Sequence, residues 1–378
     1  MDMSDKMYNL GAVGLGHWFD RLHAGMKKAN RIMITKAVGT SPLESKIALL
    51  ARFGIPTVNY YQADKYGHIP EQFYNEIDIV HISDPNQFHA MQSIDALKRQ
   101  KYVVVEKTIA TNEADFNSTI KYLIDNKQEN NLYLHLHYLH KLLTMELNHL
   151  LEKLSSHNGK INRVESVFFE EENDEDSRRS KWLFAPESGG LFMDWIHPFE
   201  VILKGARADS VKLDSIKQYV LNEGYTTIYP TGIESKITVN GRHFVEDTKW
   251  ISKIGKGVKD GLQKKTVHLY FESGNMLELN YKNSEMEFSS TERGTWNLYD
   301  KNNNIIAKGS PSGMTASELL VSDILELCNG NGPMLKIDEI KRLFQPQWDY
   351  QKMSASSALI KNKKEIRDFI SNTIDSTL

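Results

Sequence analysis

The sequence predicts an α/β domain with a doubly wound parallel (Rossmann) sheet, followed by an α+β domain whose mainly antiparallel open-faced sheet has helices on one face. Three observations predict this order. Short β-branched strands alternate with helices of about ten to fifteen residues in the first part of the chain. A glycine turn follows the first strand. From about Ile161 onward, alternating segments joined by tight turns replace this pattern.

The length of 378 residues favours two domains, because single cores stop growing at about 250–300 residues. We expect a dinucleotide-binding domain over 1–138 and a substrate-binding and oligomerisation domain over 139–378. A net charge of −3 with interspersed signs indicates neither a nucleic acid nor a membrane partner. The single Cys328 excludes a disulfide framework, and no apolar stretch is long enough to span a membrane, so we expect a cytoplasmic protein.

The first predicted strand, 8–13, leads through Gly14-Leu15-Gly16 into a helix that extends to about Lys28. A Gly-x-Gly turn between a strand and a helix is typical of a dinucleotide pyrophosphate site. Phe19 stands where the third glycine of the full motif is expected. A simple turn without a ligand therefore remains an alternative.

The second predicted strand, 33–38, ends in Gly39-Thr40-Ser41, and Lys46 lies in the next predicted helix, 43–53. NAD-binding domains usually carry a carboxylate here for the ribose diol. Its absence removes repulsion of a 2′-phosphate, and two hydroxyls with an ammonium can hold that group. NADP is therefore favoured, although an uncharged loop can also bind NAD.

The alternation continues with predicted strands near 57–58 and at 77–82, 102–107 and 131–137, and with predicted helices near 70–75 and at 89–99 and 112–127. The apolar strand 102–107 ends in Glu106-Lys107. Ligands of parallel sheets bind beyond the carboxyl ends of the strands, so Lys107 is a candidate for the site. The alternative is a strand-end lysine that reaches water.

The run from Ile79 to Ala110 resembles the Gfo/Idh/MocA oxidoreductases, through Asp84-Pro85-Asn86, His89, Ala96-Leu97 and Glu106-Lys107. The resemblance implies that Lys107 lies beside the nicotinamide and the substrate hydroxyl. Thr108 replaces the proline of that family, and we predict a trans Lys107–Thr108 bond because a cis bond before threonine costs about 2.5–4 kcal/mol. The expected cofactor-binding residues are Gly14, Leu15, Gly16, His17, Trp18, Thr40, Ser41, Lys46, Ser83, Pro85, Asn86, His89, Glu106 and Lys107.

In the second half, alternating segments joined by tight turns predict a largely antiparallel sheet. The predicted strands are 163–169, 211–221, 235–239, 266–272, 276–282 and 295–299. Helices usually cover one face of such a sheet, and the other often meets a second subunit. We therefore expect a homodimer or homotetramer.

Asp194 and His197 follow a glycine-rich entry into a predicted helix and share one face at i and i+3. A helix N-terminal acid and a packed histidine are the structural alternative. The resemblance extends here to Trp182, Gly189-Gly190, Asp194 and His197, although the family usually has the acid and the histidine at i and i+4. It implies that His197 takes the substrate proton and that Asp194 positions it.

Three histidines lie close together in the segment His135 to Lys141. A metal site would need further ligands, and none is obvious, so we predict no metal. The run His137-Tyr138-Leu139-x-Lys141 also resembles glucose-6-phosphate dehydrogenases, which implies that His137 and Lys141 hold a sugar phosphate, with Arg178 or Arg179 as further candidates. The charge run 170–176 is typical of a solvated, mobile loop.

The resemblance therefore implies an NAD(P)-dependent enzyme that transfers a hydride between nicotinamide and a hydroxyl-bearing carbon of a sugar, polyol or sugar phosphate. The catalytic residues would be Lys107, Asp194 and His197, joined in substrate binding by His137, Lys141 and Trp182. Lys107 and His197 would have to act on the same substrate atoms. The alternative is a catalytically silent sugar-sensing or partner-binding protein of the same fold, which Phe19 and Thr108 favour and the intact catalytic set disfavours.

Overall fold

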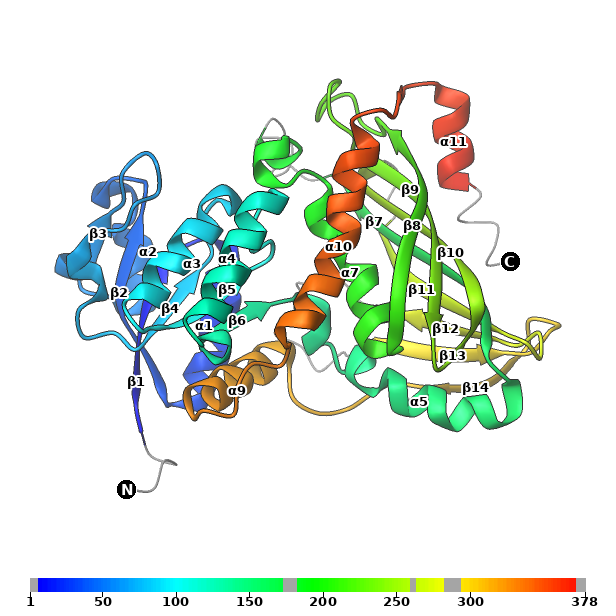
Figure 1. Cartoon of the computed structure of the whole chain (residues 1–378), viewed down its shortest axis with the longest axis horizontal. Coiled ribbons are helices and arrows are strands. Elements are labelled where there is room, and N and C mark those ends of the chain that lie inside the picture. The colour runs from blue at the N-terminus through cyan, green and yellow to red at the C-terminus, as the bar shows by residue number, and fades with distance from the viewer. Residues whose placement is uncertain (1–5, 173–181, 259–262, 282–293, 372–378) are drawn as a thin grey trace. The chain divides into compact units, whose positions relative to one another are not determined.

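The computed structural model describes residues 6–172, 182–258, 263–281 and 294–371. The chain forms two compact units, one comprising 1–136 and 314–340, and the other 137–313 and 341–378 (Figure 1). The sequence predicted a domain boundary between residues 138 and 139, and the chain passes from the first unit to the second between residues 136 and 137. It did not predict that 314–340 return to the first unit, because an amphipathic helix does not reveal from its pattern which core it will cover.

The first unit contains a six-stranded sheet in the order β3-β2-β1-β4-β5-β6, with every neighbouring pair parallel. The strand order reverses between β1 and β4, which is where doubly wound sheets bind their ligands. The predicted fold class is thus confirmed. The strands are β1 (Tyr8–Val13), β2 (Ile32–Gly39), β3 (Tyr60–Gln62), β4 (Ile79–Ile82), β5 (Tyr102–Glu106) and β6 (Leu132–His135).

Helices connect these strands as the sequence predicted, although two of them are shorter. The helix expected at 43–53 begins with a 3-10 turn at Leu43–Ser45. The helix expected at 70–75 consists of a single 3-10 turn at Glu71–Tyr74. A proline precedes each turn. The helices of this unit are α1 (His17–Ala29), α2 (Ile47–Phe53), α3 (His89–Lys98), α4 (Glu113–Asp125) and α9 (Ala316–Cys328).

Phe19, the residue in place of the third glycine, is fully buried in the core of this unit. Its ring packs edge-on against Phe53, with ring centroids 5.0 Å apart. Close helix packing occurs instead at Gly25, where an added Cβ would come within 2.4 Å of the Ser317 carbonyl oxygen on α9. The aromatic substitution therefore fills the core without opening the glycine turn.

The second unit contains a nine-stranded sheet in the order β14-β13-β12-β11-β7-β10-β9-β8-β15. The β7–β10 and β8–β15 pairs are parallel, and the other pairs are antiparallel, as predicted for most of the sheet. Its strands are β7 (Ile161–Glu171), β8 (Ala208–Tyr219), β9 (Gly232–Gly241), β10 (Phe244–Val258), β11 (Lys264–Phe271), β12 (Met276–Asn280), β13 (Thr295–Tyr299), β14 (Ile305–Gly309) and β15 (Leu359–Ile360).

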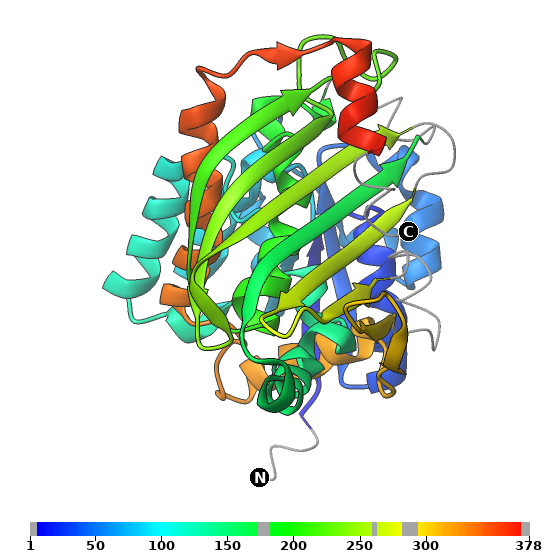
Figure 2. The ribbon, with the colours of Figure 1, turned by 90° about the vertical axis from the view of Figure 1, so that its right-hand side faces the viewer.

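The second unit also contains helices α5 (Leu142–Asn158) and α7 (Phe192–Phe199) and, from residue 341 onward, α10 (Ile337–Ser354). Helix α7 packs against β7 and β10. Trp195 of α7 donates a hydrogen bond to Ser252 of β10, and Tyr350 of α10 packs on the Trp195 ring. Figure 2 shows the opposite face of this sheet, where α11 (Lys363–Ser371, red) covers one end. There Phe369 stacks on Tyr219 with ring centroids 4.3 Å apart.

Among the described residues, no helix combines the length and apolar character needed to cross a membrane.

Candidate active site

The turn after β1 requires glycine at its first position. Gly14 has a φ of +83°, and a Cβ there would lie 2.8 Å from the backbone nitrogen of Asp84. The Ser83 hydroxyl donates to the Gly14 carbonyl at 3.0 Å, so the end of β4 holds the turn in place. Gly14 and Ser83 are thus brought together at the edge where the strand order reverses.

Gly16 has ordinary backbone geometry, and an added Cβ would meet no atom within 4 Å. No side chain caps the N-terminus of α1, which begins one residue later. Free N–H groups and the helix dipole at such a terminus suit a phosphate, so the turn fits a dinucleotide pyrophosphate. Leu15 is buried between the two glycines. His17 and Trp18 begin the helix, but their side chains lie outside the described part.

The loop after β2 carries the three residues predicted to select the cofactor. Thr40 is exposed, and the Ser41 carbonyl accepts a hydrogen bond from the Tyr60 hydroxyl at 2.6 Å. Lys46 is half-buried and directly precedes α2. These residues lie at the carboxyl end of a strand of the parallel sheet, which is the expected location for a ribose contact.

The ends of β4, β5 and β6 bring a second group of predicted residues together. Pro85 and Asn86 form the turn before α3, and His89, at the start of α3, is buried. The His89 ring lies 2.8 Å from the Thr108 carbonyl oxygen and 2.9 Å from that of Asp84. His89 therefore ties the segment after Lys107 to the end of β4.

The Lys107–Thr108 peptide bond is cis, so the predicted trans bond is wrong. Thr108 is buried, its carbonyl oxygen lies beside His89, and its hydroxyl donates to the Ala110 carbonyl at 2.8 Å. The prediction relied on the intrinsic preference of the residue types alone and took no account of the contact with His89. Lys107 itself follows β5 and is half-buried.

Glu106 is buried directly before Lys107, opposite His135 of β6. Its carboxylate hydrogen-bonds to His135 Nδ1 and lies 3.8 Å from His81 Nε2. Burial acts to raise the pKa of Glu106, but the neighbouring histidines and Lys107 outweigh it and lower that pKa. Burial has the opposite effect on a histidine, and it lowers the pKa of His81 to about 4. Glu106 thus supplies a fixed negative charge beside Lys107.

In the second unit, α7 carries Asp194 and His197 on one face, as predicted. His197 Nε2 lies 3.8 Å from Asp194 Oδ1. On the other side of the ring, Nδ1 lies 2.8 Å from the Glu200 carboxylate. Both His197 and Glu200 are buried. The imidazole is therefore held between two acids, a setting that suits proton transfer.

A network of charges continues from Asp194 along the covered face of the sheet. Lys256 of β10 lies 2.7 Å from Asp194 and 3.1 Å from Glu170, and Lys265 of β11 lies 2.7 Å from Glu170. Burial acts to raise the pKa of Glu170, but both ammonium groups outweigh it and lower that pKa. The charge run starting at Glu170 was predicted to be a solvated loop. For Glu170 this is wrong, because the residue lies within β7 between two lysines.

His137 and Lys141 lie beside His197 in the same unit. Residues His137–His140 form a 3-10 turn, and α5 follows Lys141. The ring centroids of His137 and His197 are 6.1 Å apart. The ring centroids of Tyr138 and His197 are 4.5 Å apart. The Lys141 ammonium lies over the Tyr138 ring, 4.1 Å from its centroid. Three of the predicted residues, His137, Lys141 and His197, are thus clustered around Tyr138.

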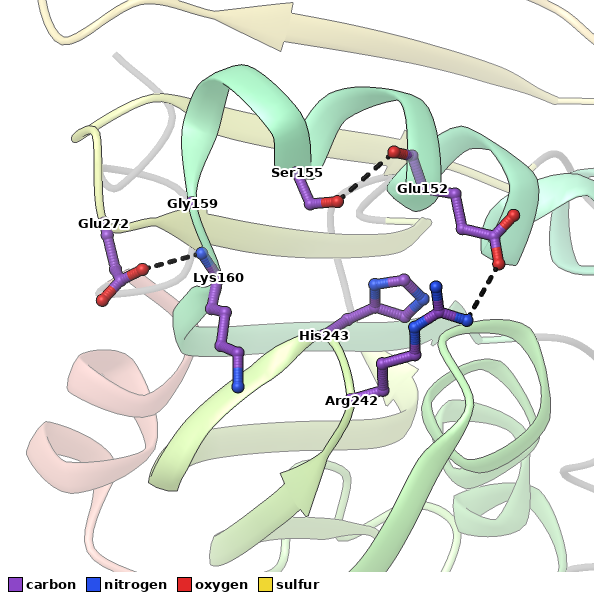
Figure 3. A pocket seen from close by; sticks show the side chains of 7 residues that line it. All are labelled: Glu152, Ser155, Gly159, Lys160, Arg242, His243 and Glu272. Atoms are coloured by element: carbon purple, nitrogen blue, oxygen red, sulfur yellow. Dashed lines mark hydrogen bonds and ion pairs between the residues drawn. The ribbon is translucent and has the colours of Figure 1, made fainter.

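Other predicted features are not part of this cluster. Trp182 is 37% exposed at the start of its described segment, and Arg178 and Arg179 lie outside the described residues. Within the described ranges, no group of three or more His, Cys, Asp or Glu side chains could hold a metal ion. A cavity of about 640 Å³ lies elsewhere in this unit. Figure 3 shows the residues that line it, which are Glu152, Ser155, Gly159, Lys160, Arg242, His243 and Glu272. No residue predicted for the site lines it.

Sequence reasoning missed Glu200, Lys256 and Lys265. A signal for Glu200 exists, because it follows His197 by three residues and therefore shares its helix face. The two lysines gave no comparable signal. Strand β10 was not among the predicted strands, and only strand pairing brings Lys256 to Glu170.

Residues 8–132 match the Gfo/Idh/MocA family, described as an oxidoreductase family with an NAD-binding Rossmann fold. The match lies within the first unit and agrees with its six-stranded parallel sheet. This match confirms the resemblance to the Gfo/Idh/MocA oxidoreductases that the motifs of the first unit indicated. No curated protein matches the chain.

Solved structures resemble the chain over nearly its whole length. An aldose-aldose oxidoreductase from Caulobacter crescentus, complexed with glycerol, has a TM-score of 0.72 at 15% identity, covering 93% of this chain and 98% of the other. A 3-ketoreductase from Actinomadura kijaniata, in complex with NADP and TDP-benzene, has a TM-score of 0.71 at 11% identity. The match covers 94% of this chain and 100% of the other. A levoglucosan dehydrogenase, in complex with NADH and L-sorbose, has a TM-score of 0.69 at 13% identity. The match covers 93% of this chain and 98% of the other. At such identities the likeness shows the two-unit fold.

Proposed function

We propose that the chain is an NAD(P)-dependent oxidoreductase that transfers a hydride between nicotinamide and a hydroxyl-bearing carbon of a sugar, polyol or sugar phosphate. The observation that carries the proposal is the setting of His197, whose Nδ1 lies 2.8 Å from Glu200 and whose Nε2 lies 3.8 Å from Asp194. A buried histidine fixed on one side can take an alcohol proton on the other. A binding protein needs no such arrangement.

The bound nicotinamide would supply the hydride acceptor or donor. Gly14 and Gly16 would let the backbone approach the pyrophosphate, and the N-terminus of α1 would face its charge. Thr40, Ser41 and Lys46 would hold the 2′-phosphate of NADP, which is why this cofactor is favoured over NAD. The match of residues 8–132 to an NAD-binding family supports the site but is silent on the preference.

Lys107 and His197 would divide the proton chemistry. His197 would accept the hydroxyl proton, and the Lys107 ammonium would stabilise the alkoxide that develops as the O–H bond breaks. The C–H bond would then break as the hydride leaves, and the alkoxide would become a carbonyl. Asp194, fixed by Lys256, would stabilise the imidazolium that results. In the direction of carbonyl reduction, His197 would return the proton.

A sugar-like substrate is supported by the names of the structural relatives, which include an aldose oxidoreductase and a levoglucosan dehydrogenase. A phosphorylated sugar is a finer proposal that depends on Lys141. This lysine is only 3% exposed and lies beside His137 at the start of a helix, a position that suits an anion.

The test is the change in nicotinamide absorbance with NADP and with NAD, against a panel of sugars, polyols and their phosphates. We expect turnover of at least one panel member, with a lower KM for NADP than for NAD. Tight cofactor binding without turnover of any member would instead favour the sugar-sensing alternative. Equal rates with glucose and glucose 6-phosphate would remove the phosphate site.

We also infer that the chain assembles as a homodimer or homotetramer through the sheet face opposite α7. Ile251 of β10 lies on that face and is 36% exposed. Sedimentation should show an oligomer that Ile251→Asp weakens. The matched control Ile228→Asp alters an isoleucine outside the strands and should leave assembly unchanged. A monomeric wild-type protein would refute the inference.

A further inference from the structure

Glu200 is a fully buried acid of the second unit, and both of its carboxylate oxygens make hydrogen-bond contacts there. One carboxylate oxygen, Oε2, accepts the backbone N–H groups of Tyr138 and Leu139 at 2.7 and 3.1 Å. The other, Oε1, lies 2.8 Å from His197 Nδ1. A single side chain therefore joins the candidate base to the backbone of the 3-10 turn that carries His137.

The helix geometry explains how Glu200 reaches both partners. Glu200 follows His197 by three residues and so lies on the same face. Pro198 stands between them and cannot donate the backbone hydrogen bond that would normally reach the Asp194 carbonyl. At Glu200 the α-helix gives way to a π-helical segment, Glu200–Gly205, and such segments often occur at functional sites.

We propose that Glu200 is a positioning residue that selects the tautomer of His197 and fixes the 3-10 turn in register with it. The proposal rests on the proposed role of His197 as the base. Backbone N–H groups can only donate, so Oε2 must accept, and an ionised carboxylate also accepts at Oε1. His197 Nδ1 must then carry the hydrogen, which leaves the lone pair on Nε2 to receive a proton.

The surroundings on the other side of the ring agree with this assignment. Asp194 Oδ1 lies 3.8 Å from Nε2, which is beyond hydrogen-bond distance, while Asp194 Oδ2 is bound by Lys256 at 2.7 Å. Asp194 thus offers negative charge to the imidazolium without fixing a hydrogen on Nε2. Glu200 sets the orientation and the tautomer, and Asp194 stabilises the charge.

Glu200→Gln is the decisive variant, because glutamine has the same shape. Its amide oxygen would be retained by the two backbone N–H donors, so its NH₂ group would face His197 Nδ1. Nδ1 would then have to accept, and the hydrogen would move to Nε2. Turnover should fall by about 10²- to 10⁴-fold, the range reported for general bases and for triads with the wrong tautomer. The KM should change little.

A direct readout, independent of activity, is the NMR spectrum of isotope-labelled histidine. The His197 signal is identified by its loss in His197→Asn. We expect the Nδ1–H tautomer in the wild-type protein and the Nε2–H tautomer in Glu200→Gln. The wild-type spectrum alone is decisive if the variant fails to fold, because an Nε2–H tautomer there overturns the proposal.

Two further variants complete the test. Glu200→Asp keeps an acceptor-only group, so it should keep the Nδ1–H tautomer and recover at least a tenth of wild-type turnover. Glu146→Gln alters an exposed acid of α5 and should change neither tautomer nor rate. An unchanged tautomer and rate in Glu200→Gln would refute the positioning role. A changed tautomer in a protein without any turnover would refute the proposed function and leave the positioning role standing.

Discussion

The Lys256 ammonium lies 2.7 Å from the Asp194 carboxylate, within a largely buried network that also includes Glu170. This contact joins the helix of the candidate base to the middle of the large sheet. The lysine neutralises two acids that would otherwise repel each other. Its side chain is only 11% exposed, so solvent cannot replace it.

Replacing Lys256 by Met should therefore leave two partly buried carboxylates without their shared cation. We expect a loss of about 3–5 kcal/mol in the free energy of unfolding, the usual cost of breaking a buried ion pair. Urea unfolding measures it. The matched control is Lys249→Met on the same strand, whose lysine is 68% exposed and pairs loosely with Asp214, so its loss should cost at most about 1 kcal/mol. Equal losses in the two variants would contradict a buried network.

Gly14 and Gly16 should respond differently to alanine. At Gly14 the positive φ costs an alanine about 1–2 kcal/mol, and its Cβ would collide with the backbone of Asp84, so stability should fall by at least that amount. At Gly16 a Cβ meets no protein atom, so thermal stability should stay unchanged while the Kd for NADP rises. Calorimetry and fluorescence titration measure the two quantities. Undiminished NADP affinity in Gly16→Ala would place the pyrophosphate elsewhere.

Glu278 should make stability depend on pH in the acid range. Burial acts to raise its pKa, but hydrogen bonds from His268, Asn297 and Asn280 outweigh it and lower the pKa to about 2, from a usual value of 4.5. A lowered folded-state pKa means that the unfolded chain binds the proton more readily. The stabilisation is therefore present above about pH 4.5 and disappears as the pH falls through about 2.

Glu278→Gln should accordingly be less stable than the wild-type protein at neutral pH, and this difference should shrink steadily below about pH 4.5. Urea unfolding across the acid range measures it. Glu246→Gln, at an exposed position of β10, is the control and should show no such convergence. A difference that stays constant with pH would rule out the lowered pKa.

Lys141→Met tests whether the substrate is phosphorylated. Loss of a charge-assisted hydrogen bond is worth about 1.5–3 kcal/mol, so the KM for a sugar phosphate should rise by about 10- to 100-fold. The KM for the unphosphorylated sugar should stay within a factor of about two. Lys160→Met, at an exposed position of the same unit, should change neither KM. An equal rise for both substrates would mean that Lys141 acts through packing on Tyr138 rather than on a phosphate.

The sequence was a good guide where local pattern decides the structure. The β-branched run ending at Glu106 forms a buried strand, and the strand, glycine turn and helix around Gly14 appear as predicted. Asp194 and His197 share a helix face because their spacing requires it. These features depend on neighbours within a few positions, which the amino-acid order records directly.

The sequence was a poor guide where distant segments decide. The ion pair between Lys256 and Glu170 depends on the pairing of β10 with β7, and the charge run suggested a solvated loop instead. The bond after Lys107 is cis, and the Thr108 carbonyl oxygen beside it contacts His89 of α3, a partner that the local sequence did not indicate. Long-range pairing and tertiary contacts of this kind leave no periodic signal in the chain.

The proposed chemistry requires Lys107 and His197 to act on one substrate, and a double-mutant cycle measures this directly. Residues that act as one catalytic unit have strongly non-additive effects. With the best panel substrate, we expect Lys107→Ala and His197→Ala each to lower kcat/KM by about 10²- to 10⁴-fold, with NADP affinity unchanged. The double variant should be little worse than the poorer single variant. Fully additive losses, or undiminished turnover in either single variant, would contradict the proposed function.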